Sequence, residues 1–206
     1  MTEQRGLVLD ASVCINLLGS GAMAEILTAL ARPVTVVAPA AREVLSDPFR
    51  NGSPGAPLAG CVEHQLLTVT DLDGSALETF VGLTAAVPPD DLDDGEAATI
   101  AFAEHRELVA VVDVKKGLRV ATTRFPHLEL LTSVDLLRVP AVLTALGRER
   151  LADAVFSACV TSRMRVPREH SEWVRELIGP ERAEKCRTLN GSRRPARNEE
   201  PIRQST

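Results

Sequence analysis

Gly6-Leu7-Val8-Leu9-Asp10-Ala11-Ser12 is the stretch that decides the fold. Its apolar run, Leu7 to Leu9, is continuous rather than alternating, as expected of a strand covered on both faces in a parallel sheet. Asp10 follows at the carboxyl end of that strand, where open α/β sheets place their ligands. The stretch therefore predicts a strand that turns at once into a helix, with a carboxylate at the corner. Asp10 or Ser12 could also serve only as a cap of that helix.

Strand and helix patterns alternate after this turn. Further strands are predicted at residues 34–37 and 108–112, with shorter ones at 66–69 and 128–131. Helical spacing is found at residues 13–18, 22–31, 39–46, 71–83, 95–106 and 115–121. Residues 47–60 are rich in Pro, Gly, Ser and Asn and are predicted to form a loop. The alternation is typical of an α/β fold, in which helices cover both sides of a parallel sheet.

Composition limits the classes of function. The chain has 206 residues, 45% of them hydrophobic, and can bury a real core. Its net charge of -5 argues against a protein that holds nucleic acid by bulk positive charge, although a local basic patch is not excluded. The sequence has no signal-peptide pattern and no apolar run of membrane-spanning length. We therefore expect no membrane partner. Its four cysteines lack paired metal-ligand spacing, so we expect a cytoplasmic protein with reduced thiols.

The C-terminal third is longer than the α/β core needs. We expect a domain at residues 1–139 and a helical extension at 140–187 that packs on the core or on a partner such as a second copy in a homodimer. Trp173 lies on an apolar stripe of this extension. Residues 188–206 contain almost no apolar side chain and are predicted to be a disordered basic tail. The tail could recruit RNA by charge or serve only to solubilise the protein.

Four acids stand at the edges of predicted elements: Asp10, Glu43, Glu96 and Asp113. Because the carboxyl ends of parallel strands share one edge of a sheet, these side chains can converge there. Each also has a structural interpretation. Glu96 fits a capping box with Asp93, Glu43 could be a solvated helix residue, and Asp113 could cap the helix after it.

A convergent set of carboxylates predicts a metal-dependent hydrolase. Two like charges about 4 Å apart repel by roughly 4 kcal/mol at an effective dielectric constant near 20, so such a cluster needs protons or cations. Carboxylates without nearby His or Cys suit Mg²⁺ or Mn²⁺, and Asp10, Glu96 and Asp113 are the predicted ligands. Such ions promote hydrolysis of phosphodiesters. The residues predicted to bind an RNA substrate are Ser12, Arg42, Lys115 and Lys116.

The ordered set of motifs resembles a PIN-domain protein. The matching pieces are Val8-Leu9-Asp10-Ala11-Ser12, Ala41-Arg42-Glu43-Val44, Gly95-Glu96-Ala97-Ala98 and Val111-Val112-Asp113. The resemblance covers about residues 6–135. It implies a three-layer α/β/α sandwich with a central parallel sheet, and a Mg²⁺-dependent endoribonuclease in which all four acids are catalytic. It also implies the toxin of a bacterial toxin–antitoxin pair, similar to the VapC-like toxins, with a small antitoxin protein as partner.

The sequence departs from this pattern beside the fourth acid. Val114 follows Asp113 where a related branch carries a second acid, and Leu118 stands where that branch has an arginine. An alternative is therefore a catalytically weakened PIN-like module that binds RNA or a protein partner. A phosphate-handling enzyme of the haloacid-dehalogenase or response-regulator type is disfavoured, because Ser12 stands where the former needs a second acid.

Overall fold

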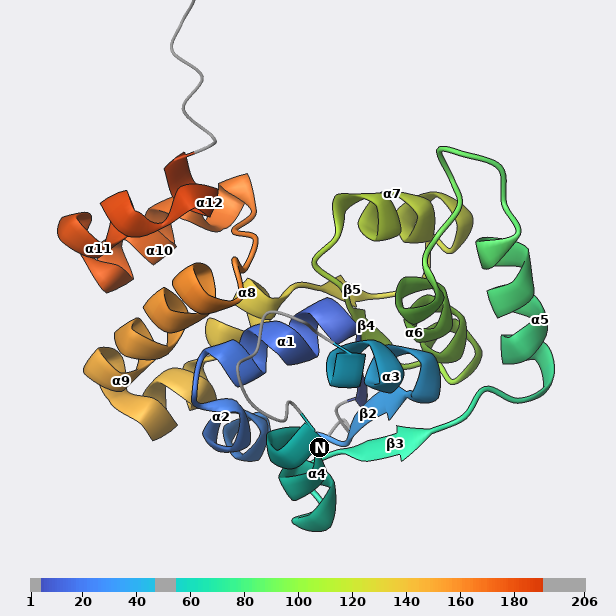
Figure 1. Cartoon of the computed structure of the whole chain (residues 1–206), viewed down its shortest axis with the longest axis horizontal. Helices are drawn as coiled ribbons and strands as arrows, with labels where there is room; N and C mark the ends of the chain where they lie inside the picture. Colours follow the sequence, from blue (N-terminus) through green and yellow to red (C-terminus); the bar gives the residue numbers. More distant parts are fainter. Residues whose placement is uncertain (1–4, 47–54, 191–206) are drawn as a thin grey trace, which may run out of the picture.

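The computed structural model describes residues 5–46 and 55–190 and contains one five-stranded parallel sheet (Figure 1). The strand order is β3-β2-β1-β4-β5, and every neighbouring pair is parallel. The strands are β1 (Leu7–Leu9), β2 (Val34–Val37), β3 (Thr68–Thr70), β4 (Val109–Val111) and β5 (Leu130–Leu131). The predicted parallel α/β sheet is therefore confirmed.

Helices cover both faces of the sheet, because side chains in β1, β2, β4 and β5 alternate between two separate hydrophobic clusters. Leu7 and Leu9 pack with one cluster, whereas Val8 packs with the other. The first face is covered by α1 (Ala11–Gly19), α2 (Met23–Leu30), α4 (Gly55–Glu63) and α9 (Pro140–Thr161). The second is covered by α5 (Gly74–Thr84), α6 (Asp94–His105) and α7 (Lys115–Arg124). The result is the predicted three-layer α/β/α sandwich (Figure 1).

The order of the strands reverses between β1 and β4. From β1 the chain adds β2 and β3 on one side, and it then returns to add β4 and β5 on the other. The two central strands pair Leu9 with Val111, and the backbone N–H of Asp10 donates to the Val111 carbonyl at 3.1 Å. Asp10 and Asp113 thus follow the two strands that flank the switch point, where open α/β sheets bind ligands.

The predicted loop at residues 47–60 is wrong in its second half, because α4 begins at Gly55. Proline and glycine in this segment suggested a loop, but Pro57 falls in the first helical turn. Backbone N–H groups in that turn have no acceptor within the helix, so a proline there removes no helical hydrogen bond. Burial of Leu58 and Cys61 against the first cluster fixes the helix in place. Residues 47–54 lie outside the described part of the chain.

The C-terminal extension packs on the core of its own chain. It contains α9, which is kinked at Gly147 with φ of 74°, and then the elements η1 (Arg168–His170), α10 (Ser171–Ile178), α11 (Pro180–Lys185) and α12 (Arg187–Asn190). A Cβ at Gly19 of α1 would lie 1.7 Å from the Oγ of Ser162, so the two segments are in close contact. The stripe of Trp173 packs against the same cluster, as predicted.

The start of the predicted disordered tail needs correction, because residues 188–190 belong to α12. Leu189 is fully buried, which explains why the helix continues there. Residues 191–206 lie outside the described part of the chain. Within residues 5–46 and 55–190, no single helix is long and apolar enough to cross a membrane; α1 and α2 pass that test only as a pair bent by 115°.

Candidate active site

Asp10 is a buried carboxylate that caps α1 with only one of its two oxygens. Its Oδ2 accepts hydrogen bonds from the backbone N–H of Ser12 at 3.2 Å and from the Ser12 hydroxyl at 2.5 Å. Its Oδ1 is buried and has no hydrogen-bond partner. A cap would be complete with Oδ2 alone, so the second oxygen is available for a ligand.

Glu96 is also buried, and neither oxygen of its carboxylate has a hydrogen-bond partner. Asp93 caps α6 by accepting a hydrogen bond from the Glu96 N–H at 3.0 Å, but the Glu96 side chain makes no return bond. The capping box considered from the sequence is therefore only half formed. An unpaired buried carboxylate is costly, so Glu96 needs either a proton or a cation.

Glu43 reaches this group from α3 (Ala38–Ser46). Its Oε1 accepts a hydrogen bond of 2.7 Å from the backbone N–H of Gly95, next to Glu96. Glu43 is thus held at the N-terminus of α6 and is not a freely solvated helix residue. Gly117, in the first turn of α7, packs closely against Glu96. A Cβ at Gly117 would lie 3.3 Å from the carboxyl carbon of Glu96.

Burial and neighbouring acids raise the pKa values of these three carboxylates. Burial, together with the charge of Asp93, raises the pKa of Asp10 to about 7. Burial raises the pKa of Glu96 to about 8, and the charges of Asp93, Asp10 and Glu43 add to this effect. Burial also raises the pKa of Glu43, with the Gly95 hydrogen bond opposing it. The structure therefore brings Asp10, Glu43 and Glu96 into one electrostatic group, which we call the acid cluster.

Asp113 follows β4 but is engaged by different partners. Its Oδ1 accepts from the backbone N–H of Ser133 at 2.8 Å, and its Oδ2 accepts from the Ser133 hydroxyl and from Nδ2 of Asn16 at 2.6 Å. It does not cap α7, whose N-cap is Val114 and has no side-chain hydrogen bond. Burial raises the pKa of Asp113, although these hydrogen bonds and the charge of Arg165 oppose the rise.

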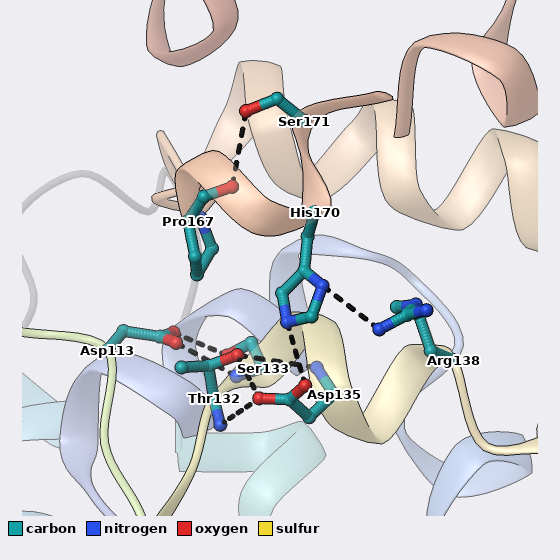
Figure 2. Close-up of polar contacts among 8 residues, drawn as sticks. All are labelled: Asp113, Thr132, Ser133, Asp135, Arg138, Pro167, His170 and Ser171. Carbon is teal, nitrogen blue, oxygen red and sulfur yellow. Dashed lines mark hydrogen bonds and ion pairs between the residues drawn. The ribbon is translucent and has the colours of Figure 1, made fainter. Parts of the chain in front are cut away.

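Ser133 is itself fixed by a network that reaches the extension (Figure 2). It begins α8 (Ser133–Leu137), whose capping box joins Thr132 and Asp135. The Oδ1 of Asp135 lies 2.8 Å from Nε2 of His170, and Nδ1 of His170 lies 3.0 Å from Nη1 of Arg138. Because arginine can only donate, Nδ1 must accept, and His170 is the tautomer with its proton on Nε2.

The predicted substrate-binding residues are placed differently from one another. Ser12 and Lys115 line a pocket of about 460 Å³ beside Asp113. Lys116 lies 3.7 Å from Asp91, and its charge lowers the pKa of Glu96, so it belongs to the surroundings of the acid cluster. Arg42 is exposed on α3 and is not among the residues that line the pocket.

Two carboxylates of the acid cluster, those of Asp10 and Glu96, carry oxygen atoms of the type that bind divalent cations. Among residues 5–46 and 55–190, no three His, Cys, Asp or Glu side chains are placed together as a ready metal site, so the predicted ligand set of Asp10, Glu96 and Asp113 stays a prediction. The unpartnered oxygens of Asp10 and Glu96 are nevertheless hard oxygen donors. Mg²⁺ is commonly held by one or two carboxylates, waters and substrate phosphates, which matches this donor set.

Sequence reasoning missed three groups that shape the site. Asp93 acts on every member of the acid cluster, but its position in an acidic loop suggested only a helix cap. Asn16 lies one helical turn after Ser12, a buried polar position that could have drawn attention. Ser133 had a signal in the Thr-Ser-x-Asp pattern of a capping box, whereas nothing in the sequence pointed to its contact with Asp113.

Comparisons with known proteins give no relative on which to rest a function. No family model, no curated protein and no solved structure matches this chain.

Proposed function

We propose that this chain is a Mg²⁺- or Mn²⁺-dependent endoribonuclease that hydrolyses phosphodiester bonds at the acid cluster. The observation that carries the proposal is the pair of buried carboxylates, Asp10 and Glu96, which present oxygens without any protein partner. Their position beside the switch point of the sheet supports a ligand site. RNA is the substrate class implied by the resemblance to PIN-domain proteins.

Asp10 and Glu96 would hold the cation, since their oxygens need a positive partner when both side chains are ionised. When bound, the ion supplies positive charge that stabilises the negative charge developing on the phosphate. The Ser12 hydroxyl fixes the orientation of the Asp10 carboxylate through its hydrogen bond to Oδ2. This leaves Oδ1 without a protein partner and able to bind the cation.

Glu43 would orient the attacking water and accept its proton. One of its oxygens is fixed by the Gly95 N–H, and the residue is only partly buried, so water can reach it. Its raised pKa makes it a better proton acceptor than an ordinary surface carboxylate. Asp113, in contrast, would hold Asn16 and Ser133 in place beside the site, because both of its oxygens already accept hydrogen bonds from these residues.

Cleavage of a labelled single-stranded RNA tests the proposal. The wild-type protein should cut the RNA with Mg²⁺ or Mn²⁺ and stop when a chelator is added. Asp10→Asn and Glu96→Gln should each lower the rate about a hundredfold or more, because each removes a charge that the reaction needs. Both variants should remain folded, which a thermal melt would establish.

Asp153→Asn is the matched control. Asp153 is an exposed acid of α9 that pairs with Arg182 at 2.7 Å, outside the acid cluster. This variant carries the same change in charge and should cleave at the wild-type rate. Equal cleavage by wild-type, Asp10→Asn and Glu96→Gln proteins would disprove the assignment of the site.

A catalytically weakened PIN-like module that binds RNA or a protein is the second candidate. The hydrogen bonds of Asp113 with Ser133 and Asn16 favour it, because they already use three of the roughly four acceptor positions of this carboxylate. RNA binding without metal-dependent cleavage would select this candidate.

A toxin role is the biological setting that the resemblance implies, with a small antitoxin as partner. A gene for a small DNA-binding protein immediately upstream would support this setting. Co-expression of that protein should then suppress the ribonuclease activity.

A further inference from the structure

A pocket of about 460 Å³ separates the core from the C-terminal extension beside the acid cluster. On the core side it is lined by Ser12 and Asn16 of α1, by Asp113, and by Lys115 at the start of α7. The extension forms the opposite wall with Ser162, Arg163 and Arg165. The pocket therefore exists only because the extension folds back onto the core.

Close contacts hold this wall in place. The Ser162 hydroxyl donates to the Ile15 carbonyl at 3.0 Å, and the Ser157 hydroxyl donates to the Gly19 carbonyl at 2.7 Å. Nη1 of Arg165 donates to the backbone carbonyl of Asp113 at 2.7 Å. These bonds join the end of α9 to α1 and to the end of β4, so the guanidinium group of Arg165 is positioned before any ligand arrives.

The pocket favours an anion. Lys115 and Arg165 bring two positive charges to its lining, against one acid, Asp113. The carboxylate of Asp113 already accepts three hydrogen bonds, from Asn16 and from two groups of Ser133. Both oxygens of this carboxylate are therefore engaged, and the pocket presents the positive charges of Lys115 and Arg165 to a ligand.

Ser12 links the pocket to the acid cluster. Its hydroxyl donates to Asp10 at 2.5 Å, and the same residue lines the pocket. A strand whose reacting phosphate lies at Asp10 and Glu96 would thus continue directly past Ser12 into the pocket. A phosphodiester needs positive charge and hydrogen-bond donors there, and arginine and lysine supply both.

We infer that this pocket is a subsite for the phosphate next to the reacting one in a single-stranded RNA, with Lys115 of the core and Arg165 of the extension as its ligands. The inference rests on the proposed ribonuclease function for its choice of ligand. It assigns the C-terminal extension a role in substrate binding, and it makes the enzyme selective for a polynucleotide over a mononucleotide.

Binding of a fluorescein-labelled oligouridylate, followed by fluorescence anisotropy in chelator at several KCl concentrations, tests the subsite without cleavage. Loss of one phosphate contact to a single strand lowers the slope of log K against log salt by about 0.7, which corresponds to about fivefold weaker binding at roughly 0.1 M salt. Lys115→Gln and Arg165→Gln should each show this loss. Arg165→Lys keeps the charge and should retain most of the slope.

Lys185→Gln is the control, because Lys185 is an exposed lysine of α11 that does not line the pocket. It should bind the oligouridylate as the wild type does. If Arg165→Gln fails to fold in a thermal melt, Lys115→Gln decides, since Lys115 is exposed and its replacement leaves the core intact.

The outcomes separate the subsite from the catalytic proposal. If Asp10→Asn abolishes cleavage while Lys115→Gln binds RNA like the wild type or like Lys185→Gln, the subsite is wrong and the ribonuclease stands. If Lys115→Gln weakens binding but the wild type never cleaves, the subsite stands in a binding module. A wild-type protein without affinity for oligouridylate would overturn the subsite.

Discussion

Glu43 accepts a hydrogen bond of 2.7 Å from the backbone N–H of Gly95, a residue 52 positions away. The bond joins α3 to the first turn of α6 and places the Glu43 carboxylate beside Glu96. A Cβ at position 95 would lie 2.6 Å from Oε2 of Glu43, closer than real Cβ contacts. Glycine is therefore needed at this position if the Glu43 carboxylate is to stay where it is, and the backbone angle of Gly95 plays no part in that requirement.

Gly95→Ala should displace Glu43 and impair cleavage. A shift of about 1 Å in a reacting group can cost about a hundredfold in rate, and we expect a loss of that order in kcat. The control is Gly82→Ala in α5, where a Cβ meets open space. That change should leave cleavage unaltered and raise stability by roughly 0.5–1 kcal/mol, because alanine is the better helix former. Equal kcat in both variants would show that Glu43 has no part in the reaction.

The metal-free protein should lose stability as the pH rises from about 4 to about 8. Burial raises the pKa of Asp10 from 3.8 to about 7 and that of Glu96 from 4.5 to about 8. The folded state then binds these protons more tightly than the unfolded chain, so deprotonation favours unfolding. A shift of about three units corresponds to roughly 4 kcal/mol for Asp10 at the upper end of this range.

Urea unfolding in chelator at several pH values would measure this dependence. Asp10→Asn should be less sensitive to pH than the wild type and more stable than it at pH 8. Mg²⁺ should stabilise the wild type more at pH 8 than at pH 5, since protons compete with the ion for the same oxygens. Parallel pH profiles for the wild type and Asp10→Asn would contradict the raised pKa of Asp10.

His170 should carry its ring proton on Nε2. Arg138 donates to Nδ1, and Asp135 accepts from Nε2, so the opposite tautomer would lose both contacts. Long-range ¹H–¹⁵N correlation spectra identify the tautomer, and a proton on Nδ1 would refute the network in Figure 2.

His170→Ala should destabilise the protein by about 1–3 kcal/mol, because it leaves polar groups of a partly buried network without a partner. His170→Gln should cost less, since an amide can still donate to Asp135. Chemical denaturation of both variants measures the difference. Equal losses would indicate that His170 contributes only by packing.

The sheet could be predicted from the sequence because its strands are short, apolar and buried on both faces. The bounds predicted for β2, residues 34–37, agree with Val34–Val37, and β1 occupies Leu7–Leu9 as expected. The α4 helix was missed because proline and glycine mark loops locally, whereas burial of Leu58 and Cys61 decides its structure. That burial depends on tertiary packing and leaves no local signal.

The site could be predicted only in part, because some of its contacts also depend on tertiary packing. Strand ends located Asp10 and Asp113, and helix starts suggested Glu43 and Glu96. The partners of Asp113 could not be foreseen, because Asn16 and Ser133 lie 97 and 20 positions from it along the chain. The wall formed by Arg165 likewise depends on how the extension folds back, which no motif in the sequence specifies.

Binding of Mn²⁺ to the metal-free protein, measured from the loss of the free-ion signal in electron paramagnetic resonance, tests the central claim most directly. The claim is that Asp10 and Glu96 together hold a divalent cation. Wild-type and Asp153→Asn proteins should bind the ion equally well at pH 8, whereas Asp10→Asn and Glu96→Gln should bind it at least about tenfold more weakly. Equal affinity in all four proteins, or no binding by the wild type, would contradict the claim.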